Sequence, residues 1–282
     1  MPGTARRRGV RDKVPSIGFW DGRVPLEVTV VRDQQTWESV VAGAIAELGG
    51  EAHLADINRT IEGHPKTATN PTWRDTVRRV VRQYNVFEPV PPLRSGVYRL
   101  RSAEPVSLQV VEPPQAGSVV DHGTAQGMLV TLGNIYGYST FAPKTDQTTR
   151  RFQGRPLGDI VGLRDCTSIF AGPNVAKIRQ IDVLWLAEDD YGLFPVYAFE
   201  VEHTTQVRDG LDRLLKIPQR YDTRLFVVGP DENTRNLFDR LTHQVPFRSH
   251  IERFRFNTYE QLGRLYNAAV AHAQNRSDFG IS

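Results

Sequence analysis

Two short hydrophobic segments that carry three acidic residues place the strongest constraint on this chain. Residues 181–186 are followed by a polar turn and then by residues 194–203, and both segments are rich in β-branched and aromatic residues. This composition predicts two buried strands. Side chains alternate between the two faces of a strand, so Glu200 and Glu202 lie on the same face. A hairpin between the two segments brings Asp182 to the same end.

Three carboxylates in an apolar setting need compensation for their charge. Burying each one costs several kcal/mol unless a partner is supplied, and a divalent cation is a natural partner for oxygen ligands. Taken separately, an Asp beside a strand usually caps a turn or forms an ion pair, and Glu-x-Glu usually marks a solvated edge strand. Phe199 and Val201 flank Glu200, however, and residues 194–203 contain no Lys or Arg. We therefore favour a metal site over the separate interpretations.

The spacing of these acids resembles that of the PD-(D/E)XK nuclease superfamily, in which an Asp on one strand precedes Glu-x-Lys on the next strand of a hairpin. Asp182 stands for the Asp and Glu200 for the Glu. Glu202 occupies the position of the Lys, and some restriction endonucleases of this superfamily carry Glu-x-Glu there. The wider stretch of residues 121–266 is similar to a bacterial family of restriction-endonuclease-like proteins that shares the phrase "IDVLWL … FEVEHTT".

The resemblance implies a fold, a cofactor and a role for each acid. The fold is a mixed-sheet α/β core of the order αβββαβ. Asp182, Glu200 and the backbone carbonyl of Val201 would bind Mg²⁺, for which Mn²⁺ would substitute, and Glu202 would orient or deprotonate the attacking water. The implied activity is that of a DNA endonuclease of the restriction or defence type. A restriction role further implies a homodimer, because two active sites usually cut the two strands.

Further residues near the acids in the expected fold are candidates for the chemistry. His203 is a possible general base, although a histidine at a strand end more often has a structural role. Gln126 lies on the first helix of the catalytic half, where the superfamily often places an acid. Arg208 is a candidate for the positive charge that the missing Lys would supply. Thr204 or Thr205 is expected to cap a helix whose N-terminal N–H groups would hold a phosphate.

Alternating helical and strand patterns in the second half independently predict an α/β sheet. We expect a helix over 122–136 followed by a strand over 135–141, with a polar loop at 146–151. Further strands are predicted at 224–228 and 253–256, and further helices at 231–241 and 259–273.

Residues 36–101 predict three helices and a hairpin. The helices begin near Thr36, Leu54 and Trp73, and the hairpin pairs 86–88 with 96–100. This order is that of a winged helix-turn-helix domain, and the stretch resembles the HARE-HTH module of chromatin-associated proteins and restriction endonucleases. By that resemblance, the third helix would enter the major groove of double-stranded DNA. The DNA-binding candidates are the arginines of this helix: Arg74, Arg78, Arg79 and Arg82. The alternative is an arginine-rich surface helix in a protein-interaction module.

Charge and composition divide the chain further. Residues 1–101 carry a net charge of +5 and the remainder −2, which suits a part that binds a polyanion joined to a part that binds metal. We predict a basic, partly disordered or extended arm at 1–35, a winged helix at 36–101, a linker at 102–120 and a nuclease domain at 121–282.

Composition excludes several classes of protein. The chain has 282 residues, of which 39% are hydrophobic and 24% charged, as in globular proteins. No apolar run reaches the roughly 20 residues of a membrane span, and the arginine-rich N-terminus lacks the apolar core of a signal peptide, so we expect a cytoplasmic protein. The single Cys166 excludes an internal disulfide and a cysteine-based zinc site.

Three alternatives to a DNA endonuclease of ordinary specificity stay open on the sequence. The catalytic half could be degenerate, which would leave a DNA-binding regulator. The enzyme could be a nuclease specific for modified DNA. The acids could also serve a metal-dependent enzyme that acts on RNA or small phosphate esters.

Overall fold

The computed structural model describes residues 35–102, 109–111, 120–189, 191–203 and 206–281. Contacts group the described residues from Thr36 onward into one compact unit. The predicted basic arm lies outside the described residues apart from Gln35, as does most of the predicted linker. None of the helices in the described ranges combines the length and apolarity that crossing a bilayer requires.

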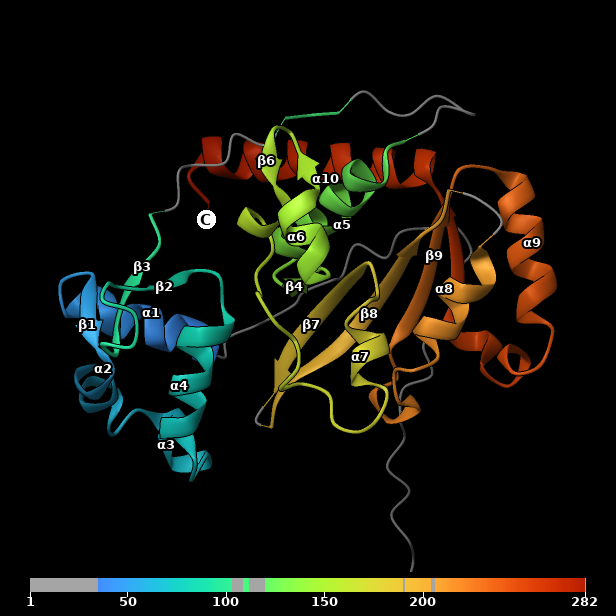
Figure 1. Cartoon of the computed structure of the whole chain (residues 1–282). Helices are drawn as coiled ribbons and strands as arrows, with labels where there is room; N and C mark the ends of the chain where they lie inside the picture. The colour runs from blue at the N-terminus through green and yellow to red at the C-terminus, as the bar shows by residue number, and fades with distance from the viewer. Residues whose placement is uncertain (1–34, 103–108, 112–119, 190, 204–205, 282) are drawn as a thin grey trace, which may run out of the picture. The chain divides into compact units, whose positions relative to one another are not determined.

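A mixed five-stranded sheet forms the centre of the second half (Figure 1), and its strand order is β10-β9-β8-β7-β4. Strand β7 pairs antiparallel with both β4 and β8, whereas β9 runs parallel to β8 and β10. The predicted hairpin is therefore confirmed as β7–β8, and the predicted α/β class with a mixed sheet agrees with the structure. The strand bounds are β4 Ser139–Phe141, β7 Val183–Asp189, β8 Gly192–Val201, β9 Arg224–Gly229 and β10 Phe254–Thr258.

Helices cover both faces of this sheet. Side chains of α5 (His122–Ile135) and α10 (Tyr259–Phe279) share a core with the sheet residues Trp185 and Phe199. Side chains of α8 (Val207–Leu214) and α9 (Glu232–Thr242) belong to a second core with Leu184, Ala198 and Leu225. Neighbouring residues of one strand thus enter different cores, as the alternation of a strand requires.

Several predicted bounds change for identifiable reasons. The expected polar loop at 146–151 is wrong, because Lys144–Thr149 forms helix α6. This helix buries none of its residues, so it lacks an apolar stripe in the sequence. The predicted strand at 135–141 begins only at Ser139, because Gly137, at φ +75°, follows the end of helix α5.

The remaining short elements connect these layers. They are β5 Arg151–Phe152, β6 Arg155–Pro156, η1 Leu157–Asp159, α7 Val175–Ile178, η2 Gln219–Tyr221 and η3 Phe247–Arg253.

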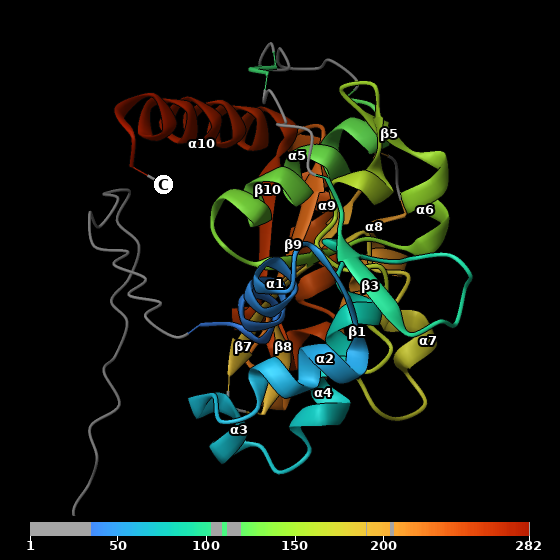
Figure 2. The same cartoon turned by 90° about the vertical axis from the view of Figure 1, so that its left-hand side faces the viewer.

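The N-terminal module (residues 36–101) contains the three predicted helices and the predicted hairpin, and Figure 2 shows its helices around β1 and β3. Thr36 caps α1 as expected, since its hydroxyl accepts a hydrogen bond from the Ser39 N–H. The sequence did not predict β1 or α3; β1 completes a three-stranded antiparallel sheet of order β1-β3-β2. The bounds are α1 Trp37–Glu47, β1 Glu51–His53, α2 Leu54–Ile61, α3 Pro65–Thr69, α4 Trp73–Gln83, β2 Phe87–Pro89 and β3 Val97–Leu100.

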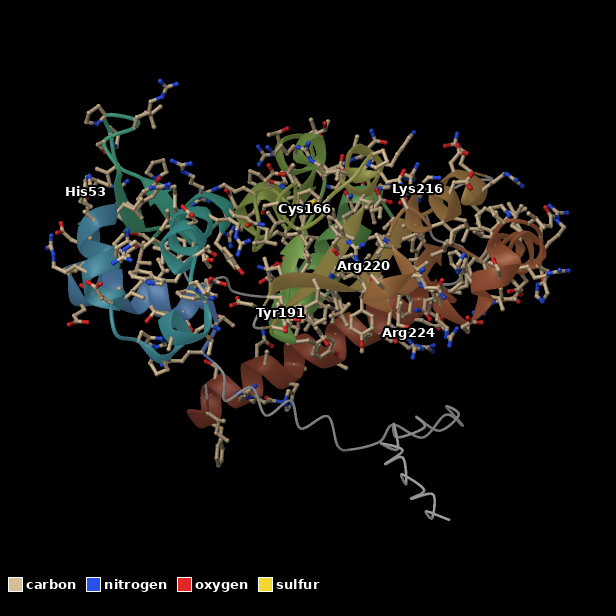
Figure 3. All side chains as sticks on the ribbon, turned by 90° about the horizontal axis from the view of Figure 1, so that it is seen from below. His53, Cys166, Tyr191, Lys216, Arg220 and Arg224 are labelled. Carbon is tan, nitrogen blue, oxygen red and sulfur yellow. The ribbon has the colours of Figure 1, made fainter. Side chains whose placement is uncertain are left out.

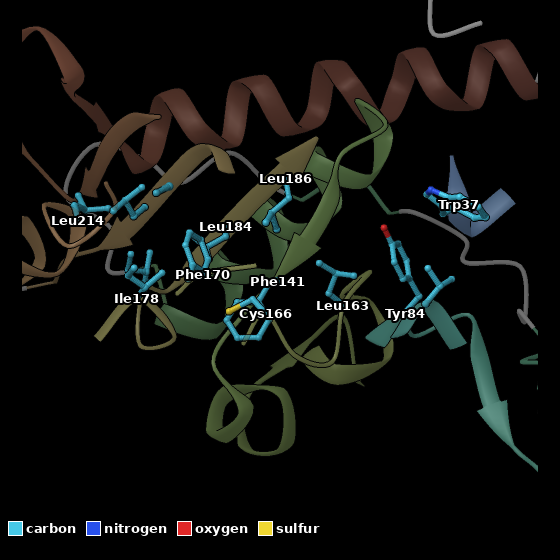
Figure 4. Close-up of a cluster of buried hydrophobic side chains, with 14 of the residues drawn as sticks. Trp37, Tyr84, Phe141, Leu163, Cys166, Phe170, Ile178, Leu184, Leu186 and Leu214 are labelled. Atoms are coloured by element: carbon cyan, nitrogen blue, oxygen red, sulfur yellow. The ribbon is translucent and has the colours of Figure 1, made fainter. Parts of the chain in front are cut away.

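The N-terminal module and the sheet share one hydrophobic core. Tyr84 and Leu163 form a bridge between the two parts (Figure 4), and the Asn85 N–H donates to the Gly162 carbonyl at 2.8 Å. The Arg164 guanidinium donates to the carbonyls of Asn85 and Phe87. These backbone contacts, beside a continuous apolar core, fix the end of α4 against the second half of the chain.

Two acidic residues, Glu38 and Glu188, lie near each other at the same junction. The backbone N–H of Trp37 donates to Glu188 at 3.0 Å, and the Lys66 ammonium lies 3.4 Å from the same carboxylate oxygen. Burial, followed by repulsion from Glu188, raises the pKa of Glu38 to about 7.

This elevated pKa makes the stability of the junction depend on pH. Protonated Glu38 is favoured in the folded state, so its contribution is complete below pH 4.5 and is lost as the pH rises through about 7. We expect the free energy of unfolding of the wild type, relative to Glu38→Gln, to fall between these values by up to about 1 kcal/mol per pH unit. Urea denaturation at several pH values measures it. Glu47→Gln, on an exposed residue of the same helix, is the control and should leave the profile unchanged; coincident profiles for wild type and Glu38→Gln would contradict the assignment.

Candidate functional site

The structure brings the three acids of the sequence motif together at one end of the hairpin. Asp182 directly precedes β7, and Glu200 and Glu202 lie at the end of β8, where Val183 pairs with Phe199. The exposed fractions of the three acids are 7%, 0% and 6%. Oδ2 of Asp182 accepts a hydrogen bond from the Val201 N–H at 2.7 Å, which fixes this carboxylate against β8.

Glu200 is compensated by an arginine. Nε and Nη2 of Arg213, on α8, donate to the two carboxylate oxygens of Glu200 at 2.9 and 2.5 Å. Burial, followed by repulsion from Asp182, raises the pKa of Glu200 well above its usual value, and Arg213 opposes that rise. The hydrogen bonds to Glu200 in turn raise the pKa of Arg213.

Arg213 is the arginine that contacts the acids, whereas the sequence suggested Arg208 as the source of positive charge beside them. The Arg208 guanidinium lies over the ring of Phe247, 5.7 Å from its centroid. Gly210 is the sequence signal that could have identified Arg213. A glycine lets α8 approach the acids closely, and Arg213 lies three residues later on the same face of the helix. A Cβ at this position would lie 2.7 Å from Oε1 of Glu202 and 3.3 Å from Cβ of Glu200.

The carboxylate of Glu202 has no hydrogen-bond partner among the described residues, although its backbone N–H donates to the Val228 carbonyl at 2.8 Å. Burial, followed by repulsion from Asp182, raises its pKa to about 7. A carboxylate with a pKa near neutrality is suited to accept a proton from water.

Two residues that the sequence did not single out complete the acid cluster. Nε2 of His122, on α5, lies 3.2 Å from Oδ1 of Asp182, and Asp146 approaches from α6. One ligand atom from each of His122, Asp146 and Asp182 lies within 4.8 Å of the other two. Burial disfavours protonation of His122, but the hydrogen bond to Asp182 raises its pKa overall.

Gln126, a predicted candidate, links this group. It is fully buried on α5, one turn after His122, and its Nε2 donates to Oδ2 of Asp146 at 2.8 Å and to the Asp182 carbonyl at 3.2 Å. Its Oε1 has no partner among the described residues. Because the sequence pattern did not reveal α6, Asp146 could not be placed beside Gln126 before the structure was known.

His203 and Tyr259 form the other side of the cluster. The Tyr259 hydroxyl donates to the Glu202 carbonyl at 2.7 Å and lies 3.0 Å from Nδ1 of His203. The rings of His203 and His122 are 5.4 Å apart, and Nε2 of His203 has no partner in the described part of the chain. Burial, followed by the charge of His122, lowers the pKa of His203. The predicted helix cap at Thr204 or Thr205 lies outside the described residues.

These donors fit a divalent cation. Carboxylate oxygens suit Mg²⁺ and Mn²⁺, and an imidazole nitrogen adds a preference for transition metals. The residues that could hold such an ion are His122, Asp146 and Asp182, which form the only such group found among the described residues. The sequence also predicted Glu200 and the Val201 carbonyl as metal ligands, and neither belongs to this group. Both carboxylate oxygens of Glu200 accept hydrogen bonds from Arg213. These two ligands stay predictions.

The four arginines of α4 do not share one environment. Arg74 is paired with Glu62 and Arg78 with Asp75, and both are exposed. Arg82 is exposed and forms no ion pair with any described residue. Arg79 is half-buried and lies against the turn between β7 and β8.

The ion pair of Glu200 and Arg213 supports a test of stability. Arg213→Met leaves a buried carboxylate without a partner, so we expect the free energy of unfolding at neutral pH to fall by about 3 kcal/mol. The double variant Glu200→Gln/Arg213→Met should recover part of that loss, because the uncompensated charge is gone. Chemical denaturation in EDTA gives the double-mutant cycle, with the exposed Arg208→Met as the control on the same helix. Equal losses for Arg213→Met and the control would contradict this account.

The chain is similar to type II restriction enzymes. A family model described as the type II restriction enzyme NmeDI C-terminal domain matches residues 107–276, which contain the whole acid cluster. Type II restriction enzyme NmeDI of Neisseria meningitidis serogroup C is 27% identical over 159 residues, which cover 53% of this chain and 43% of that relative. The matched part of the chain thus spans less than half the length of this relative. No solved structure matches the chain significantly.

Proposed function

The chain belongs to the family of the type II restriction enzyme NmeDI C-terminal domain, and from this premise we propose that it is a Mg²⁺-dependent DNA endonuclease of the restriction type. The observation that carries the proposal is the convergence of Asp182, Glu200 and Glu202 at one sheet end, each at most 7% exposed. Structural ion pairs rarely require three nearly buried acids beside one arginine, whereas hydrolysis of a phosphodiester commonly uses such a group with metal.

We further propose that the catalytic half has the PD-(D/E)XK core. Its support is the antiparallel hairpin β7–β8, with Asp182 at its start and Glu200-x-Glu202 at its end, followed by α8 and the parallel strand β9. The order of these elements and the place of the acids are those expected from the resemblance.

Asp182 would hold the ion, either with His122 and Asp146 or with Glu200 and the Val201 carbonyl. When bound, Mg²⁺ or Mn²⁺ would polarise the phosphodiester and make a nearby water more acidic. Asp182 would be the residue common to both sets of ligands.

The surrounding residues would handle the proton and the charge. Glu202 would orient the attacking water and accept its proton at the carboxylate, for which a pKa of about 7 is suitable. Tyr259 holds the Glu202 backbone in place. Arg213 would supply the positive charge that the PD-(D/E)XK pattern assigns to its Lys, and His203 would be a second proton acceptor through Nε2.

The decisive experiment is a cleavage assay. Purified protein is incubated with methylated and unmethylated plasmid and genomic DNA, with Mg²⁺, Mn²⁺ or EDTA. We expect cleavage only with metal, and a loss of at least about a hundredfold in Asp182→Asn and Glu202→Gln. The exposed acids Asp239 and Glu232 give matched controls, Asp239→Asn and Glu232→Gln, which should cut as the wild type does.

The outcomes of this assay separate the candidate functions. Cleavage that survives both active-site changes would refute the assignment of the acids. Absence of cleavage on every DNA, with intact DNA binding, would favour a catalytically degenerate regulator; the observation behind this second candidate is Glu202 in place of Lys. Cleavage confined to methylated DNA would identify a nuclease specific for modified DNA.

We propose that the N-terminal module is a winged helix that binds duplex DNA. Its support is the order of α1, α2 and α4 followed by the hairpin β2–β3, together with the exposed arginines of α4. We also propose a homodimer, because cutting both strands of DNA usually takes two active sites.

Arg82 offers the cleanest test of helix α4. It is exposed, and replacing it breaks no ion pair with any described residue. If Arg82 contacts a phosphate, Arg82→Ala should weaken binding of duplex DNA similarly for all sequences and reduce the salt slope by about one. Fluorescence anisotropy at several salt concentrations, in EDTA, measures both quantities. Arg240→Ala, on an exposed residue of α9, is the control. A wild-type slope in Arg82→Ala would remove this residue from the interface.

A further inference from the structure

A concave site, separate from the acid cluster, lies at the other end of the hairpin β7–β8. We call it the junction pocket; it has a volume of about 430 Å³ and is lined by α4, η2 and the turn between the two strands, with Arg79, Gln83, Arg220 and Tyr221 among its residues. Asp182 and Asp189 are seven residues apart on an extended chain, which separates the pocket from the acid cluster by about 23 Å. Cavities of this size are within the range of small-ligand sites.

Gln83 is the most informative residue of the junction pocket. It is only 6% exposed, and its Oε1 accepts a hydrogen bond from the Ser168 hydroxyl at 3.2 Å. This contact directs the amide group, yet its Nε2 has no hydrogen-bond partner among the described residues. A buried donor without a partner is costly, so an acceptor on a ligand would satisfy it.

The remaining lining residues define the chemistry of that ligand. Arg79 and Arg220 supply two guanidinium groups, neither of which forms an ion pair with a described residue. Tyr221 and Phe194 supply rings, and the Arg220 guanidinium lies 4.9 Å from the centroid of the Tyr221 ring. Such a site suits an anionic group joined to a flat ring with hydrogen-bond acceptors.

One acidic residue, Asp189, also lines the junction pocket. Oδ1 of Asp189 accepts hydrogen bonds from the backbone N–H groups of Tyr191 and Gly192, which hold the turn, and the two guanidinium groups of Arg79 and Arg220 outnumber its single negative charge. The side chain of Tyr191 is 99% exposed, and Figure 3 labels it together with Arg220 in the view from below. Tyr191 thus gives the rim of the pocket a further exposed ring.

We propose that the junction pocket binds one unstacked nucleotide of the bound DNA. The phosphate would lie against Arg79 and Arg220, and the base against Tyr221 and Phe194, with Gln83 donating to the edge of the base. A base outside the stack can be read in this way on its hydrogen-bonding edge. This inference rests on the proposed function, since it assumes that the protein binds DNA. The pocket would hold one nucleotide of that DNA, and the acid cluster would cut the same DNA at another position.

The first test measures binding of the four deoxynucleoside 5′-monophosphates by calorimetry in EDTA, which keeps metal out of the acid cluster. We expect at least one of them to bind about tenfold more tightly than inorganic phosphate, because stacking on a ring adds to the charge attraction. Binding no tighter than that of inorganic phosphate would overturn the inference.

The second test compares two duplexes, one fully paired and one with a single unpaired nucleotide. The wild type should bind the second about tenfold more tightly, and Gln83→Met and Arg220→Ala should lose that preference. Arg220 is exposed, so its removal keeps the test valid if Gln83→Met fails to fold. Gln180→Met and Arg240→Ala change exposed residues of the same types outside the pocket and should retain the preference. A preference that persists in Arg220→Ala, or is absent from the wild type, would refute the inference.

A separate variant distinguishes this inference from the proposed function. Asp182→Asn should lose cleavage but keep the preference for the unpaired nucleotide, because the acid cluster and the junction pocket lie at opposite ends of β7. If the wild type cuts DNA without showing that preference, the inference fails while the proposed function stands. If it shows the preference but cuts no DNA, the endonuclease proposal fails while the pocket remains a nucleotide site.

Discussion

The need to compensate three nearly buried carboxylates at one sheet end determines much of the surrounding structure. Glu200 has no exposed surface and would be strongly destabilising as a lone anion, so Arg213 is held against it by two hydrogen bonds. Asp182 is fixed by the Val201 N–H and contacted by His122. The carboxylate of Glu202 accepts no hydrogen bond from any residue that the structure describes, and its pKa is raised to about 7. Glu200 is thus neutralised by an ion pair, Asp182 is held in one orientation, and Glu202 can gain or lose a proton near neutral pH.

This division of roles depends on close packing of two helices from opposite faces of the sheet. Gly210 allows α8 to approach Glu200 and Glu202, since a side chain there would collide with Oε1 of Glu202. On the other side, Gln126 is fully buried and joins α5 to Asp146 of α6. The charges of the site are therefore positioned by side chains whose own packing leaves little freedom, as a preorganised site requires.

The sequence predicted the hairpin β7–β8 and the grouping of its acids because strand alternation is a strong, local pattern. It also predicted three N-terminal helices, whose apolar positions repeat at helical spacing. It did not reveal α6, which buries nothing, and so it missed Asp146 and the link through Gln126. Arg213 was missed because the prediction did not use Gly210, which marks the face of α8 that packs against the acids and on which Arg213 lies one turn later. The shared core of the N-terminal module and the sheet likewise depends on contacts between distant residues, such as Tyr84 and Leu163, that no local pattern encodes.

The central claim is that the acid cluster holds a divalent ion through Asp182. Anomalous diffraction from crystals grown with Mn²⁺ tests this directly, because the ion itself is located. The account predicts a peak at about 2.1 Å from a carboxylate oxygen of Asp182, together with at least one ligand from His122, Asp146, Glu200 or the Val201 carbonyl. A peak bound elsewhere, or no peak at saturating Mn²⁺ while Arg213 still pairs with Glu200, would contradict it.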